Sequence, residues 1–141
     1  MLYFDHSATT PIHPDIQLLI KELNQDIYGN PSSIHAAGRK AKHIVETARK
    51  QIADAVNCAP KEIIFTGGGS EANNLVLWNM MYRDRKHVIT SAIEHPAILA
   101  VLKQLEHLGI SHTIIPVNKY GWVNPEDIDA AIRENTGLIS I

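Results

Sequence analysis

Short apolar runs alternate with helical patterns along the second half of the chain, and this alternation limits the folds open to it. Helical patterns run from about Ser70 to Tyr82, from Pro96 to Gly109 and over residues 124–135. The apolar runs between and around them are EIIFT, HVITS, HTIIPV and GLISI, at residues 62–66, 87–91, 112–117 and 137–141. Such strand–helix–strand repeats are typical of α/β domains. We therefore predict an α/β fold, with a mostly parallel sheet flanked by helices.

Two further helices are expected before the first of these strands. Residues 13–29 have Pro14 in a first turn and Gly29 as a stop signal. Residues 30–57 form a longer helical pattern, which Ser32 or Ser33 can cap. We predict a single α/β domain over residues 1–141, in which residues 1–30 supply an N-terminal segment and a helix packing on it.

The last apolar run, GLISI, is followed by no turn, cap or covering helix. A strand of a parallel sheet is normally covered on both faces. We therefore expect the domain to be incomplete, as in a truncated chain.

Composition excludes several classes of protein. The net charge of -2, with charged residues spread along the chain, predicts neither a nucleic-acid partner nor a membrane-surface face. No apolar stretch approaches the roughly 20 residues that span a bilayer. The single cysteine, Cys58, excludes a disulfide framework and fits a reducing compartment, so we expect a cytoplasmic protein. The eight histidines are scattered, and we predict no metal site.

A glycine-rich loop, TGGGSEANN at residues 66–74, joins the first predicted strand to the next helix. One interpretation is a tight turn without a ligand, because glycine clusters are common in loops. Another is a site for the phosphate of a compact cofactor. In that case the backbone N–H groups of Gly69 and Ser70 bind the phosphate at the helix start, and the Ser70 hydroxyl adds a donor.

The third interpretation of this loop is a dinucleotide site, because Gly67, Gly69 and Ala72 match the pattern G-x-G-x-x-A. Such a site also needs an acidic residue about 20 positions further on, at the end of the next strand. Ser91 stands at that strand end, and Glu94 comes slightly late. Glycine spacing alone does not separate a dinucleotide from a single phosphate.

Four motifs follow one another along the chain: YFDHSATTP, GNPSSIHAAGRKA, EIIFTGGGSEANN and EHPAI, at residues 3–11, 29–41, 62–74 and 94–98. In this order and spacing they resemble the N-terminal part of cysteine desulfurases of the NifS/IscS type. These are fold-type I enzymes of the class V aminotransferase superfamily, which use pyridoxal 5'-phosphate (PLP). The resemblance implies PLP-dependent removal of sulfur from L-cysteine, which gives L-alanine and an enzyme persulfide for iron–sulfur cluster or thio-product synthesis. It also implies a homodimer and a sulfur-acceptor protein such as an iron–sulfur scaffold.

The same resemblance implies roles for individual residues. Gly69 and Ser70 correspond to the pair that binds the cofactor phosphate, with Gly68 beside them. His95 corresponds to a catalytic histidine that stacks on the pyridine ring of the cofactor and moves protons. Ala8 and Thr9 correspond to a segment with a supporting role near the active site.

This sequence departs from the family pattern in its glycine loop. Gly67 replaces a common serine and Ser70 replaces a threonine. Serine keeps the hydroxyl donor, whereas the loss of a side chain at residue 67 is expected to loosen the loop.

Other groups of the family lie further along the chain than this sequence reaches. They are the Schiff-base lysine, the aspartate that pairs with the pyridine nitrogen and the nucleophilic cysteine, and Cys58 does not occupy the nucleophile's position. We therefore predict that this chain is inactive by itself. Selenocysteine lyase or another class V PLP enzyme remains an alternative, as do a non-catalytic truncated or split-gene product and a dinucleotide-binding module.

Overall fold

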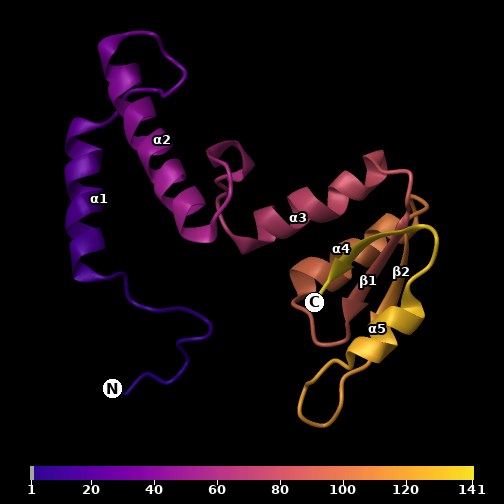
Figure 1. Cartoon of the computed structure of the whole chain (residues 1–141). Helices are drawn as coiled ribbons and strands as arrows, with labels where there is room; N and C mark the ends of the chain where they lie inside the picture. Colours follow the sequence, from indigo (N-terminus) through magenta and orange to yellow (C-terminus); the bar gives the residue numbers. More distant parts are fainter. Residues whose placement is uncertain (1) are drawn as a thin grey trace. The chain divides into compact units, whose positions relative to one another are not determined.

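The computed structural model describes residues 2–141, which form two compact units (Figure 1). The first unit extends to Ile64 and the second begins at Phe65. Each unit is described by itself. The prediction of a single domain over residues 1–141, with residues 1–30 packing on it, stays a prediction.

The first unit consists of two helices and a short 3-10 turn. Helix α1 spans Pro14–Asp26, helix α2 spans Ala36–Val56 and the 3-10 turn η1 spans Pro60–Glu62. Proline at the first position of α1 costs nothing, because the N–H that it lacks has no partner within the helix. The ring of His13 caps this helix, since its Nδ1 accepts a hydrogen bond from the Asp15 N–H at 3.3 Å.

Helix α2 begins at a histidine, and the prediction that Ser32 or Ser33 caps it was wrong. His35 is the N-cap, and its Nδ1 accepts from the Gly38 N–H at 3.3 Å. The chain before it folds back closely on the helix. A Cβ on Gly38 would lie 2.3 Å from the Ser33 carbonyl oxygen, so only glycine permits this approach. The serines therefore belong to the preceding turn rather than to the cap.

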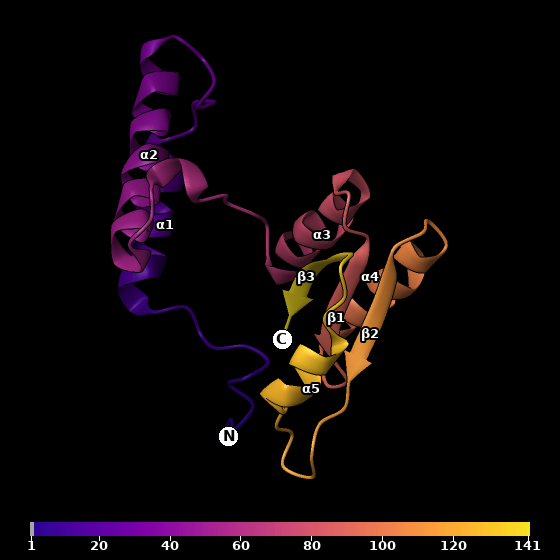
Figure 2. The same cartoon turned by 45° about the vertical axis from the view of Figure 1, so that its right-hand side comes forward.

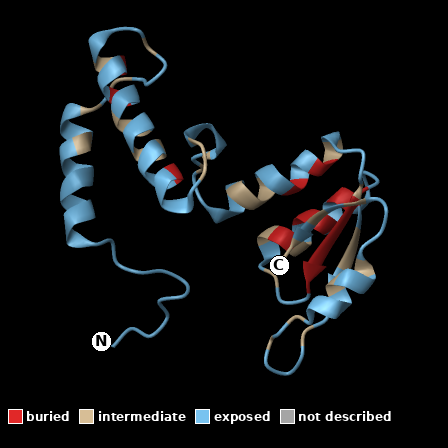
Figure 3. Ribbon diagram, in the orientation of Figure 1, coloured by how far each residue is buried: buried red, intermediate tan, exposed pale blue. Residues whose placement is uncertain are grey.

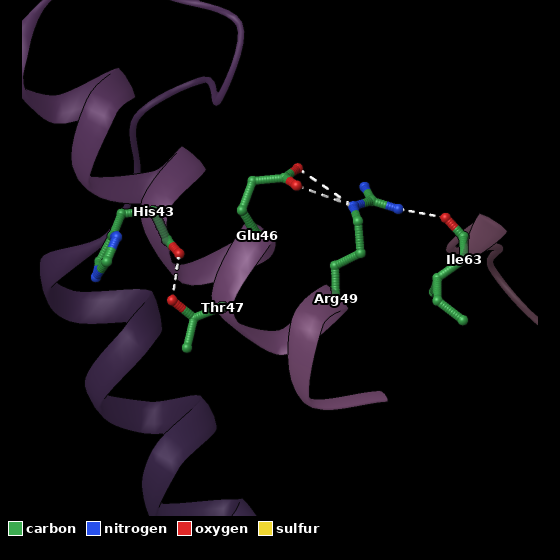
Figure 4. Close-up of polar contacts among 5 residues, drawn as sticks. All are labelled: His43, Glu46, Thr47, Arg49 and Ile63. Atoms are coloured by element: carbon green, nitrogen blue, oxygen red, sulfur yellow. Dashed lines mark hydrogen bonds and ion pairs between the residues drawn. The ribbon is translucent and has the colours of Figure 1, made fainter. Parts of the chain in front are cut away.

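An arginine connects α2 to the segment that follows η1 (Figure 4). The Arg49 Nε donates to both carboxylate oxygens of Glu46, and its Nη1 donates to the Ile63 carbonyl. On the same helix, the Thr47 hydroxyl bonds the His43 carbonyl at 2.8 Å. The end of the first unit is therefore fixed to the side of α2.

The second unit is an α/β layer structure, as the alternation predicts. Helix α3 (Gly69–Asn79) continues into the 3-10 turn η2 (Met80–Tyr82), so the pattern expected to about Tyr82 is helical throughout. The strands are β1 (His87–Ser91), β2 (Ser111–Ile115) and β3 (Thr136–Ser140), and the helices between them are α4 (Pro96–Glu106) and α5 (Pro125–Ala131).

The three strands form one parallel sheet in the order β2-β1-β3. Helices α3 and α4 pack against each other, and α4 lies behind the sheet and α5 in front of it (Figures 1 and 2). The predicted fold class is therefore confirmed.

The first of the four predicted strands, EIIFT, is absent from the described chain. Residues 63–66 have no strand assignment, although Ile63 has extended backbone angles of φ -87° and ψ 125°. The Ile63 carbonyl accepts from the Arg49 side chain instead of from a neighbouring strand. Ile64 is 67% exposed, which fits a connecting segment better than a buried strand. The apolar run was therefore misleading, because a strand needs a ladder partner as well as β-forming residues.

Burial in the second unit centres on β1, whose five residues are all buried (Figure 3). Helix α4 contributes four buried side chains to the core, of which Leu102 and Leu105 are completely buried. Burying a leucine contributes roughly 1.5–3 kcal/mol. The full cluster comprises Leu77, Met80, Val88, Ile98, Val101, Leu102, Leu105 and Ile110. No helix in the described part of the chain is long and apolar enough to cross a membrane.

One polar side chain, His87, lies fully buried at the start of β1. Its Nδ1 lies 2.8 Å from the Thr136 hydroxyl of β3, and its Nε2 lies 2.9 Å from the Thr113 hydroxyl of β2. The ring thus bonds both neighbours of the central strand. Burial lowers the pKa of His87 below its usual 6.5, and the positive charge of Arg133 and the nearby His112 lower it further.

This lowered pKa predicts a pH-dependent stability. Below pH 6.5 the unfolded chain binds a proton at this histidine, whereas the folded chain does not. The free energy of unfolding should therefore decrease as the pH is lowered, down to the pKa that His87 has in the folded protein. Denaturant unfolding at a series of pH values measures this slope. His87→Gln should remove the contribution of His87 to this slope. Replacement of the exposed His107 by glutamine should leave that contribution in place. Equal slopes for the two variants would contradict the assignment.

Candidate functional site

Two helix N-termini lie at the same edge of the sheet. Helix α3 runs in roughly the opposite direction to β1 and ends near the start of that strand. Helix α4 begins after the end of β1 (Figures 1 and 2). Both helices therefore start at the carboxyl edge of the strands, where ligands bind in open α/β sheets. A cavity lined by residues that include Asn73 of α3, Ile98 of α4 and Ser140 of β3 lies between these elements.

The glycine loop leaves the N-terminus of α3 open. Gly68 is the N-cap, with φ +158°, and no side chain caps the helix. The first hydrogen bond of the helix runs from the Ala72 N–H to the Gly68 carbonyl at 3.1 Å. The N–H groups of Gly69, Ser70 and Glu71 consequently have no partner within the helix. A Cβ added at Gly68 or Gly69 would meet nothing within 4 Å, so there is room for a ligand beside these amides.

A carboxylate orders the start of this loop. The Gly67 N–H donates to Glu71 Oε2 at 2.5 Å, and the Thr66 hydroxyl donates to the Gly68 carbonyl at 3.2 Å. A Cβ on Gly67 would lie 3.0 Å from the same Glu71 oxygen, so glycine eases the approach of this carboxylate. The sequence prediction missed Glu71. Its signal was available, because glutamate three residues after an N-cap often accepts a backbone N–H there.

These groups fit a phosphate. Open amides at a helix N-terminus donate hydrogen bonds to an anion, and the Ser70 hydroxyl adds another donor at the same turn. The positive end of the helix dipole also attracts a dianion, by up to about 2 kcal/mol when the site is partly buried. Gly69 and Ser70, with Gly68 beside them, are thus the residues that would hold a cofactor phosphate.

His95 lies at the same edge, at the start of α4. It is the N-cap of this helix, and its Nδ1 accepts from the Ala97 N–H at 3.1 Å. Pro96 follows at the first helical position. A neutral imidazole that accepts at Nδ1 carries its proton on Nε2. The exposed ring can therefore cap the helix and offer Nε2–H to a ligand at the same time.

The residues before His95 form a short, fixed loop. The buried Ser91 hydroxyl donates to Glu94 Oε1 at 3.0 Å, and the Ala92 N–H donates to the Ile115 carbonyl of β2 at 2.9 Å. In the dinucleotide interpretation Glu94 would bind a ribose hydroxyl. Its bond to Ser91 gives this carboxylate a structural partner instead, which weakens that interpretation.

The remaining predicted site residues lie in the first unit. The N–H groups of Ala8 and Thr9 both point to the Asp5 carbonyl, at 3.1 and 3.4 Å, in an exposed turn. Their supporting role stays a prediction. Among residues 2–141, no group of three or more His, Cys, Asp or Glu side chains is arranged to hold a metal ion.

The two roles of the His95 ring are separable by mutation. His95→Ala removes the capping acceptor and should lower the free energy of unfolding by about 1 kcal/mol. His95→Asn keeps an acceptor in the N-cap position and should restore most of that loss. Denaturant unfolding of the two variants and the wild type measures the difference. Equal losses of unfolding free energy in both variants would mean that the hydrogen-bond acceptor at the N-cap does not stabilise the protein.

Comparison with known proteins extends over the whole described chain. The family described as Aminotransferase class-V matches residues 2–141. A "NifS/IcsS protein homolog" of Lactobacillus delbrueckii subsp. bulgaricus is 42% identical over 144 residues, which cover 100% of this chain and 37% of the relative. "Cysteine desulfurase IscS" of Dictyoglomus turgidum is 41% identical over 143 residues, which cover 99% and 36%. The chain therefore spans little more than a third of the length of these relatives.

Solved structures agree with this relationship. A structure named "NIFS-LIKE PROTEIN" has a TM-score of 0.90 at 30% identity, and it matches 98% of this chain and 39% of its own. "SspA in complex with cysteine" has a TM-score of 0.88 at 35% identity, and it matches 97% of this chain and 40% of its own. The sequence resemblance is thereby confirmed at the level of sequence and of structure. The chain belongs to the aminotransferase class V family.

Proposed function

We propose that these residues form the N-terminal, phosphate-binding part of a PLP-dependent cysteine desulfurase, which removes sulfur from L-cysteine and releases L-alanine. The observation that carries the proposal is the open N-terminus of α3 at the same sheet edge as His95. Relatives named cysteine desulfurase support it, as does a structural neighbour in complex with cysteine. These comparisons do not favour a dinucleotide-binding module.

In this proposal each residue has a defined task. The Gly69 and Ser70 amides and the Ser70 hydroxyl bind the phosphate, and Gly68 leaves space beside them. When bound, PLP supplies an electron sink that stabilises negative charge developing on the substrate. The His95 ring would stack on the cofactor ring. Its Nδ1 is held by the Ala97 N–H, so Nε2 is the atom that carries and exchanges a proton.

Wider features of the protein follow the same proposal. We assign the activity to the whole protein, in which further segments supply the lysine, the aspartate and the cysteine nucleophile. We also propose a homodimer in the cytoplasm that passes sulfur to an acceptor such as an iron–sulfur scaffold, or to thio-products. Support for a partner chain comes from α1, which has no buried residue and exposes Ile16, Leu18, Leu19 and Ile20. Support for the compartment comes from the single cysteine.

The reaction tests the proposal directly. The full-length protein, loaded with PLP and given L-cysteine and dithiothreitol, should produce alanine and sulfide in equal amounts. His95→Asn keeps the helix cap and should lower kcat by about 10²–10⁴-fold, the usual contribution of a general acid–base group. A loaded wild type that forms no alanine would remove the assignment. Parallel assays with L-selenocysteine, and a titration with NAD, test the selenocysteine lyase and dinucleotide alternatives.

The phosphate site has a separate test by equilibrium binding. Ser70→Ala removes one donor to a charged ligand and should raise the Kd for PLP about tenfold or more. The control is Ser111→Ala, at the opposite edge of the same sheet, where the hydroxyl bonds the Lys86 carbonyl. Titration followed by the visible absorbance of the cofactor measures both. A Kd for Ser70→Ala equal to that of the control would show that this hydroxyl does not bind the phosphate.

A further inference from the structure

We infer that Glu94 is a positioning residue for His95, because its bond to the buried Ser91 hydroxyl fixes the loop that carries the imidazole. The inference rests on the proposed function, in which the His95 ring covers the cofactor. Glu94 itself is assigned no contact with cofactor or substrate. Its effect is transmitted through the backbone to the next residue.

The anchor of this loop is among the most deeply buried parts of the described chain. Ser91 is the last residue of the fully buried central strand and is only 1% exposed. A buried hydroxyl needs a hydrogen-bond partner, and the Ser91 hydroxyl donates to Glu94 Oε1 at 3.0 Å. Glu94 therefore couples the position of the loop to the core of the sheet.

Hydrogen bonds attach the loop to each of three neighbouring elements. Ala92 binds β2 through the Ile115 carbonyl, Glu94 binds β1 through Ser91, and the His95 ring binds the first turn of α4. Of these, the Glu94 attachment is the one directly before the imidazole-bearing residue. Pro96 directly after it has a fixed φ and restricts the backbone of His95. Without the Glu94 side chain, the loop residue directly before His95 loses its hydrogen bond to β1.

Charge and hydrogen bonding at residue 94 can be separated by substitution. Glu94→Gln removes the negative charge but keeps an oxygen that accepts the Ser91 hydroxyl. Glu94→Ala removes both, and Ser91→Ala removes the donor while leaving the carboxylate. A positioning role through the hydrogen bond predicts that the alanine variants are impaired and the glutamine variant is not.

The test uses the full-length protein and two measurements. In Glu94→Ala and Ser91→Ala, kcat for L-cysteine should fall between about tenfold and a hundredfold with an unchanged KM, since the ring is misplaced but still present. Hydrogen exchange measured by mass spectrometry on the protein without cofactor should be faster in peptides covering residues 92–98. Glu94→Gln should match the wild type in both measurements.

Glu62→Ala is the matched control, because Glu62 braces a turn in the first unit by accepting the Ala59 N–H at 2.7 Å. It should leave both the exchange at residues 92–98 and kcat unchanged. Wild-type exchange and kcat in Glu94→Ala would overturn the inference. So would equal impairment of Glu94→Gln and Glu94→Ala, which would make the charge responsible. A wild type that forms no alanine would refute the proposed function, while the exchange comparison would still decide whether Glu94 fixes the loop.

Discussion

Burial of the central strand is the constraint on which the second unit depends. Strand β1 has a hydrogen-bonded neighbour on each side and buried side chains along its whole length. Its amino end carries His87, which bonds both neighbouring strands. Its carboxyl end carries Ser91, which fixes the loop before His95. A fully buried strand thus determines the positions of polar groups at both of its ends.

The candidate site is built mainly from helix termini. At α3 the donors are backbone amides, which the fold orients without any side-chain entropy cost. At α4 an imidazole occupies the N-cap, so one side chain both ends the loop and faces the ligand edge. Glycine at residue 68 serves the first terminus by its conformation, and Glu71 holds the loop before it. The geometry of such a site is therefore set by the helices that form it.

Much of this arrangement was predictable from the sequence. The strand–helix alternation predicted the three strands and the three α-helices of the second unit, because those segments have both the right pattern and a partner to pack against. EIIFT has the pattern alone, and its carbonyl at Ile63 bonds an arginine side chain that no local rule foresees. Gly69, Ser70 and His95 were predicted as site residues from motifs, and their roles stay a prediction. Glu94 was considered only as a ribose ligand, because its bond to Ser91 depends on the geometry of a turn.

Three helices of this chain begin with the same device, an imidazole that accepts a backbone N–H through Nδ1. They are α1, α2 and α4, capped by His13, His35 and His95. Each of these caps therefore also carries a second ring nitrogen, a group that a serine or aspartate cap does not have.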